Sequence, residues 1–281
     1  SVTATSRGAD RSAELARRTA TGLALAVVVL GSVVNVFAFA LVVLLVALGS
    51  LWELAQLAGR KGTALAFPLA ALVVTVYVVL AALGLQHQYE KSLLALTIIA
   101  SLAGSLGGPR QGYFARSAMT VFSILYIGWL STYFLALRNL PHLGAAFAAA
   151  AVVAIAMTDI FAMLVGVAIG RTPLSPISPK KTWEGAIGGL VATTLVGGSL
   201  AFLPLGIPWW QGLFIGAVTS VAAQIGDLVE SALKRDAHVK DAGRFLGEQG
   251  GILDRFDSYT FGGIAFYAAL FVTGHIPPIH P

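Results

Sequence analysis

The sequence of 281 residues contains no cysteine and few charged residues. Without cysteine the chain cannot form disulfide bonds, thiolate metal sites or a cysteine nucleophile. Only 11% of the residues are Asp, Glu, Lys or Arg, whereas 57% are hydrophobic. This composition is typical of a bundle of membrane helices and not of one or two soluble domains.

The sequence also has fewer acidic than basic residues, which gives a net charge of +5. Such a charge can indicate a nucleic-acid partner, but here the basic residues are scattered among apolar segments instead of gathered on a polar surface. We therefore expect no nucleic-acid partner, and interpret the basic residues as signals of membrane topology.

The long apolar runs predict an all-α fold, a polytopic integral membrane bundle of about nine transmembrane helices. Charged residues and Gly, Pro and Asn clusters divide the chain into apolar segments at 19–32, 35–57, 64–84, 92–107, 117–137, 144–169, 183–203, 210–233 and 258–275. The first segment follows Arg17 and Arg18 and is similar to a signal peptide, but it runs into a second apolar segment without a convincing cleavage site. We expect it to be a span.

The basic residues predict the orientation of this bundle, because cytoplasmic loops are enriched in Lys and Arg. With the N-terminus inside, all of the 18 Lys and Arg residues except Lys91 and Arg138 lie on the inner side. We expect a cytoplasmic tail at 1–18, N-terminal membrane helices at 19–143, and catalytic membrane helices at 144–281. Cytoplasmic loops are expected within the last region at 170–183 and 234–257.

Three acidic residues lie deep within predicted spans: Asp159, Asp227 and Glu230. Each costs about 2.5–3.5 kcal/mol on insertion scales, so these carboxylates must face a wet cavity, a cation or one another. Asp227, Glu230, Ser231 and Lys234 share one helix face, although Glu230 and Lys234 could form only a simple i,i+4 pair. These residues are candidate site residues.

Asp254 and Asp257 begin the last predicted span and would lie on one face of it. Clustered carboxylates without cysteine or converging histidines favour a hard cation such as Mg²⁺ over zinc. The five histidines do not converge: one lies in the basic loop and the others near outer ends of spans, namely His238 and then His87, His142, His275 and His280.

Basic residues accompany these acids at the same predicted membrane side. In RTPLSPISPKKTWEG, residues 171–185, Ser178 is a plausible helix N-cap with Pro179 at the first helical position. Free backbone amides and Lys180 and Lys181 would then form an anion site, or the two lysines could be topology signals only. The loop after residue 233 adds further basic residues, which suits a site for polyphosphate: Lys234, Arg235, Lys240, Arg244 and Arg255.

The second half of the chain resembles the phosphatidate cytidylyltransferases, or CDP-diacylglycerol synthases. The resemblance lies in SALKR at 231–235, Lys240-Asp241 and GGILDRFD at 250–257, and also in ISPKKTWEG at 177–185. A fourth element is the pattern Asp159, Ala162, Gly166 and Gly170. Together these motifs span residues 158–263, whereas the N-terminal half is similar in hydropathy alone.

This resemblance implies a magnesium-dependent transfer of CMP from CTP to phosphatidic acid, with a second monovalent cation such as K⁺. It also implies a homodimer in the inner cell membrane with its active site facing the cytoplasm. In the family, aspartates matching Asp227 and Asp254 bind cations. One departure is Gln249, which stands where the family usually has a histidine and cannot titrate near neutral pH.

From these observations we expect two groups of site residues. Those expected to act in catalysis are Asp227, Asp254, Lys234, Arg235 and Asp257, with the three aspartates as metal ligands. Those expected to bind substrate are Ser178, Lys180, Lys181, Glu230, Ser231, Lys240, Asp241, Arg255, Asp159 and Gln249. The remaining alternatives are a CTP-dependent lipid kinase, a cytidylyltransferase for another lipid phosphate, and a transporter.

Overall fold

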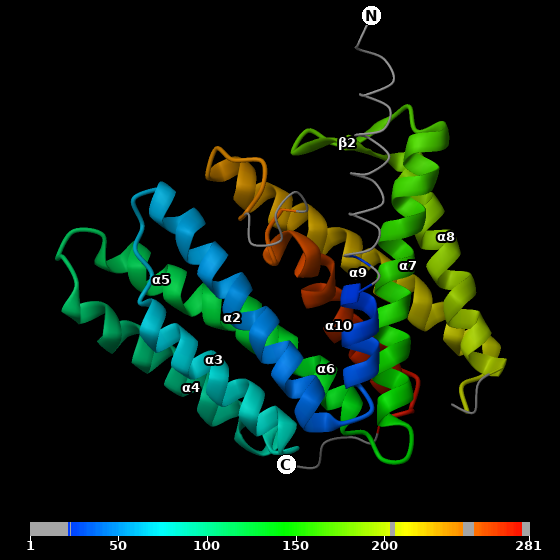
Figure 1. The fold of residues 1–281 in the computed structure, drawn as a ribbon, viewed down its shortest axis with the longest axis horizontal. Coiled ribbons are helices and arrows are strands. Elements are labelled where there is room, and N and C mark those ends of the chain that lie inside the picture. Colours follow the sequence, from blue (N-terminus) through cyan, green and yellow to red (C-terminus); the bar gives the residue numbers. More distant parts are fainter. Residues whose placement is uncertain (1–21, 23, 203–205, 244–249, 277–281) are drawn as a thin grey trace, which may run out of the picture.

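A computed structural model of the protein describes residues 22, 24–202, 206–243 and 250–276, which form a bundle of α-helices with one short β-hairpin (Figure 1). Residues 24–32 are helical. They are followed by α2 (Val36–Arg60), α3 (Phe67–Ala82), α4 (Gln86–Gly104), α5 (Tyr113–Ser123), α6 (Leu130–Arg138), α7 (Gly144–Ile169), α8 (Trp183–Ser199), α9 (Trp209–Asp236) and α10 (Leu253–Val272). The hairpin consists of β1 (Pro173–Ser175) and β2 (Ser178–Thr182) and joins α7 to α8.

Five helices of the described part are long and apolar enough to cross a membrane: Val36–Arg60, Gln86–Gly107, Tyr113–Arg138, Gly144–Ile169 and Trp209–Asp236. The third of these is one continuous helix, because a π-helical stretch at Ile124–Trp129 joins α5 to α6. The prediction of a helical membrane protein is therefore confirmed. The count of nine spans stays a prediction.

The helices form two groups that meet at α10. Figure 1 shows α2 to α6 on one side of the molecule and α7, α8 and the hairpin on the other. Helix α10 packs against α9 and α7 and also against α2 and α6. Its buried side chains include Leu253 near its start and Phe266 near its end. Helix α10 therefore lies between the two groups of helices.

Close packing of α8 on α9 depends on glycine. A Cβ atom on Gly216 would lie 3.0 Å from the Cα atom of Thr194, and Gly197 and Gly212 meet in the same crossing. Small residues allow two helix backbones to approach closely where lipid gives no hydrophobic drive for association. This crossing fixes the path of α9, whose second half carries Asp227 and Glu230.

The hairpin corrects one prediction. The all-α fold class holds, but Ser178 does not cap a helix, because Ser178–Thr182 is a strand paired with Pro173–Ser175. A residue that precedes proline is biased to extended backbone, which explains why Ser178 before Pro179 joins a strand. Helix α8 begins later, and its N-cap is Thr182, whose side chain accepts a hydrogen bond from the Gly185 amide at 3.2 Å.

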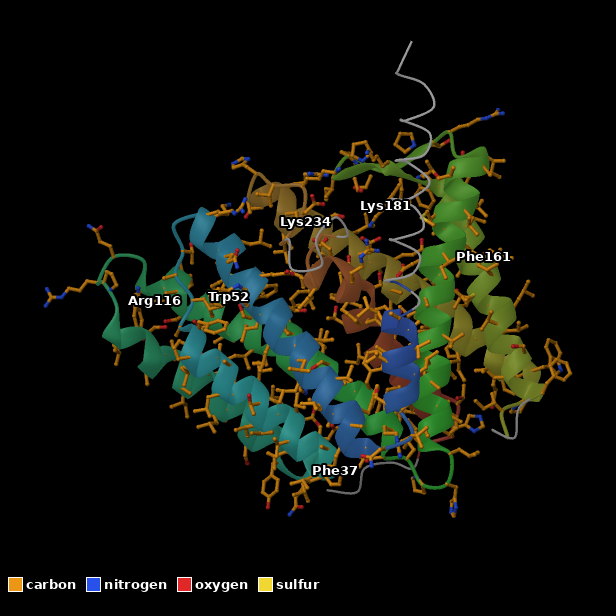
Figure 2. All side chains as sticks on the ribbon, viewed as in Figure 1. Phe37, Trp52, Arg116, Phe161, Lys181 and Lys234 are labelled. Atoms are coloured by element: carbon orange, nitrogen blue, oxygen red, sulfur yellow. The ribbon has the colours of Figure 1, made fainter. Side chains whose placement is uncertain are left out.

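Polar and basic groups gather at one end of the bundle. The hairpin and the end of α9 lie at this end in Figure 1, and Figure 2 shows Lys181 and Lys234 near it with Phe37 at the opposite end. Lys61, which follows α2, pairs with Asp236 at the end of α9 at 2.5 Å. Basic residues of three predicted inner loops therefore lie at the same end of the molecule.

Candidate active site

A cavity of about 550 Å³ opens between the hairpin and helices α7, α8, α9 and α10. Acids, bases and hydroxyls from far-apart segments line it, which only the packing of these helices brings together. The predicted site residues on its wall are Asp159, Ser178, Lys180, Lys181, Asp227, Asp254, Arg255 and Asp257. The apolar part of its wall includes Met163 and Val167 of α7, which are exposed side chains on the outside of the bundle.

Three carboxylates converge at this cavity: Asp227, Glu230 and Asp257. One oxygen of each lies within 4.8 Å of the other two. Asp227 and Glu230 share a face of α9, as their spacing predicted, and Asp257 comes from the first turns of α10. Glu230 is fully buried and Asp257 is 5% exposed. Such close acids are stable only with compensating positive charge or protons.

Lys181 supplies positive charge from the hairpin side. Its ammonium lies 2.5 Å from Asp227 Oδ2, and both side chains are partly exposed to the cavity. Lys181 lies near the end of β2, and the next residue, Thr182, caps α8. The end of the strand therefore places Lys181 beside the acids. The backbone amides of Arg171 and Thr172 donate to Glu184 of α8, which holds the base of the hairpin.

Lys234 of α9 supplies positive charge on the side of Glu230 and Asp254. Its ammonium lies 2.5 Å from Glu230 Oε2 and 2.6 Å from Asp254 Oδ1, and the Lys234 side chain is only 14% exposed. Asp254 Oδ2 also accepts hydrogen bonds from the amides of Gly251 at 2.7 Å and Ala242 at 3.0 Å. Asp254 therefore lies beside Lys234 and outside the group of Asp227, Glu230 and Asp257.

Asp159 joins the same polar cluster from α7. The Ser258 hydroxyl donates to Asp159 Oδ1 at 3.2 Å, and the Ser258 amide donates to Asp257 Oδ1 at 2.7 Å. Ser258 thus links the carboxylates of two helices. The prediction that Asp159 faces a polar cavity agrees with this placement.

Six predicted site residues of the described part do not line the cavity: Glu230 and Lys234, which lie beside acids of its wall, and four others. Arg235 donates to the Val239 carbonyl at 3.0 Å on the exposed side of α9, and Ser231 is buried within the bundle. Lys240 and Asp241 line a separate cavity of about 530 Å³ with Gln56 and Arg60. Gln249 lies outside the residues that the structure describes.

Residues 16–273 match the model of the cytidylyltransferase family. The chain belongs to this family. It is 37% identical over 201 residues to the protein named phosphatidate cytidylyltransferase 4, chloroplastic, of Arabidopsis thaliana. The match covers 62% of this chain and 50% of the relative. It is 43% identical over 150 residues to the phosphatidate cytidylyltransferase of Bacillus subtilis (strain 168), covering 53% of this chain and 56% of the relative.

A third cytidylyltransferase relative, the phosphatidate cytidylyltransferase of Mycobacterium leprae (strain TN), is 37% identical over 152 residues, which are 54% of this chain and 48% of the relative. The chain thus spans about half the length of these curated relatives. The family resemblance read from the motifs is confirmed.

The donor set at this cavity fits a hard divalent cation. Asp227, Glu230 and Asp257 offer only carboxylate oxygens, the ligands that Mg²⁺ prefers. Lys181 and Lys234 touch two of these acids, so cationic side chains already neutralise part of the cluster. A site with cation ligands and adjoining ammonium groups can hold a polyphosphate and stabilise charge on a transferred phosphorus.

Four polar residues around the cavity were not predicted from the sequence. Ser258 and Gln224 line the cavity, Glu184 holds the hairpin, and Glu53 of α2 accepts a hydrogen bond from the Leu253 amide at the start of α10. Glu53 carried the same signal as Asp159, since it is an acid within the apolar segment 35–57. A contact across 200 residues of sequence gave no local signal.

Proposed function

We propose that this protein transfers CMP from CTP to phosphatidic acid, giving CDP-diacylglycerol and pyrophosphate for phospholipid synthesis. The observation that carries the proposal is the convergence of Asp227, Glu230 and Asp257 beside Lys181 in the cavity of a cytidylyltransferase-family chain. Relatives that bear the name phosphatidate cytidylyltransferase support the choice of substrates.

In this proposal the catalytic cation is Mg²⁺, held by Asp227 and Asp257 with Glu230. Asp254 remains a proposed ligand of the same cation region, although its oxygens now accept hydrogen bonds from Lys234 and two backbone amides. Bound magnesium would supply positive charge that offsets the charge of the phosphates and of the transferred phosphorus. A second, monovalent cation such as K⁺ remains part of the proposal.

The reaction forms one P–O bond and breaks another. A phosphate oxygen of phosphatidic acid attacks the α-phosphorus of CTP, and the bond to the β-phosphate breaks to release pyrophosphate. The attacking oxygen is already anionic at neutral pH, so no general base is needed. The chain must instead bring two anions together, which is a task for positioned positive charge.

In this proposal the basic residues divide this task between the two substrates. Lys180 and Ser178 of the hairpin and Lys181 would bind the lipid phosphate, while Arg255 would bind the phosphates of CTP. Lys234 keeps Glu230 and Asp254 in place, because its ammonium contacts both carboxylates. Asp159 would complete the polar wall. Arg235 stays a proposed catalytic residue, and Ser231, Lys240, Asp241 and Gln249 stay proposed substrate-binding residues.

The proposal includes the setting of the enzyme. The chain would cross the inner cell membrane about nine times with its N-terminus and active site on the cytoplasmic side, and act as a homodimer. The tail at 1–18, the helices at 19–143 and the catalytic region at 144–281 would be its parts. The gathering of Lys61, Lys181 and Lys234 at one end of the bundle supports this orientation.

One labelling experiment tests the function. The purified protein is given CTP labelled at the α-phosphate, phosphatidic acid and Mg²⁺, and the lipid and nucleotide fractions are then separated. We expect label in the lipid, release of pyrophosphate, and loss of both on chelation of the metal. Release of labelled CDP with unlabelled lipid would indicate a lipid kinase, and labelled CTP left intact would contradict both enzymes.

Lys180→Ala tests the lipid-phosphate end of the cavity. Loss of one charge-assisted contact to phosphate is expected to raise KM for phosphatidic acid roughly tenfold while the KM for CTP changes little. The matched control is Lys91→Ala, an exposed lysine of α4 that is not on the cavity wall. Equal kinetics of both variants and the wild type would leave Lys180 as a topology signal only.

A further inference from the structure

The start of α10 lacks a capping side chain of its own at the N-cap position. Ile252 occupies this position, and its apolar side chain cannot accept a hydrogen bond. The first amides of a helix need acceptors, and a helix end without them is destabilised. The matter is important here because Asp254 and Asp257 both lie within the first two turns of α10.

Glu53 of α2 supplies the missing acceptor. Its Oε2 atom accepts a hydrogen bond from the Leu253 amide at 2.8 Å, and the Ile252 amide lies against the same carboxylate. Glu53 is only 3% exposed, so water does not compete for these bonds.

Residues around Glu53 pack closely against the segment that begins α10. A Cβ atom on Gly243 or on Gly251 would overlap the Glu53 carboxylate, so both backbones lie directly against it. One helical turn before Glu53, the side chain of Ile252 fills the space that a Cβ atom on Gly49 would need. Residues 251–253 thus pack against the face of α2 that carries Gly49 and Glu53.

The same short segment holds Asp254. The Gly251 amide donates to Asp254 Oδ2, and Lys234 joins Asp254 to Glu230. A movement of residues 251–253 would therefore move Asp254 and turn Asp257 away from Asp227. We infer that Glu53, from the N-terminal half of the chain, is a positioning residue that sets the start of α10 and so the spacing of the acids in the cavity.

The inference rests on the proposed function for its kinetic readout alone. Two conservative variants separate the reach of Glu53 from its charge. Glu53→Gln keeps the length of the side chain and one oxygen for the Leu253 amide, whereas Glu53→Asp keeps the charge and withdraws the oxygens by one methylene. A positioning role through reach predicts that the aspartate variant is impaired and the glutamine variant is not.

Hydrogen exchange and metal binding provide readouts that do not depend on catalysis. In metal-free protein, Glu53→Asp is expected to speed exchange of the amides at 252–254 roughly tenfold, the effect of losing a bond to a charged group. It is also expected to weaken Mn²⁺ binding several-fold and to lower kcat with the KM for lipid unchanged. Glu53→Gln should stay within about twofold of the wild type in all three.

The control is Gln88→Asn, the same one-methylene shortening at an exposed residue of α4, which is expected to match the wild type. Wild-type exchange and Mn²⁺ binding in Glu53→Asp would overturn the inference, and so would impairment of Glu53→Gln alone, which would indicate a role of charge. If Glu53→Asp does not fold, Gly243→Ala displaces the carboxylate without changing α10, and the same two outcomes decide. Hydrogen exchange and Mn²⁺ binding can be measured whether or not the protein has the proposed activity, so these two measurements test the inference separately from the proposed function.

Discussion

Asp227→Asn is expected to lower turnover by roughly a hundredfold to a thousandfold, the loss typical of removing one essential charge at a reacting phosphate. Asp227 belongs to the group of three converging carboxylates and also contacts Lys181. The amide keeps the size of the side chain but removes its negative charge, so the site binds a divalent cation more weakly. Initial rates across a magnesium titration measure the effect.

The control for this variant lies on the same helix. Asp236→Asn removes the charge of an exposed aspartate whose partner is Lys61, away from the cavity wall. Its rates and its magnesium dependence are expected to match those of the wild type. Wild-type turnover in a folded Asp227→Asn protein would refute the proposed cation site.

Lys234→Met is expected to cause a large loss of stability. The Lys234 ammonium contacts Glu230, which is fully buried, and Asp254, which is 10% exposed. Methionine has a similar shape but leaves both carboxylates without their cation. Breaking a buried pair in this way costs about 3–5 kcal/mol of unfolding free energy.

Thermal unfolding in detergent measures this loss. At this chain length such a cost corresponds to a fall in Tm of roughly 10 °C. The control is Lys61→Met in the Lys61–Asp236 pair, whose side chains are 43% and 64% exposed. An exposed pair contributes about 0–1 kcal/mol, so its Tm is expected to change by only a few degrees. Equal shifts for the two variants would show that Lys234 does not stabilise the buried acids.

Helices with long apolar runs could be predicted closely from the sequence. The predicted span at 144–169 coincides with α7, Gly144–Ile169, because a long and mostly apolar run leaves the backbone no other way to satisfy its hydrogen bonds in lipid. The hairpin at Pro173–Thr182 was missed, since Ser178, Pro179 and two lysines also match the start of a helix. Thr182, four residues later, became the cap instead.

The candidate site was predicted in part for a similar reason. The spacing of Asp227, Glu230 and Lys234 determines that they share one face of α9, whatever the rest of the chain does. Spacing could not predict which acids meet across helices. In the structure Asp254 contacts Lys234, whereas Glu230 lies close to Asp227 and Asp257. Distances between helices depend on packing, such as the close crossing at Gly197, Gly212 and Gly216.

The sequence by itself determined that this is a helical membrane protein, which family it belongs to, and which acids and lysines gather near α9 and α10. Only the tertiary structure decided which of those acids lie close together and that Lys181 of the hairpin contacts Asp227. It also decided that Glu53 accepts a hydrogen bond from the start of α10. The physical reason is that helical periodicity acts over a few residues, whereas contacts between helices are set by the shapes of surfaces far apart in the chain.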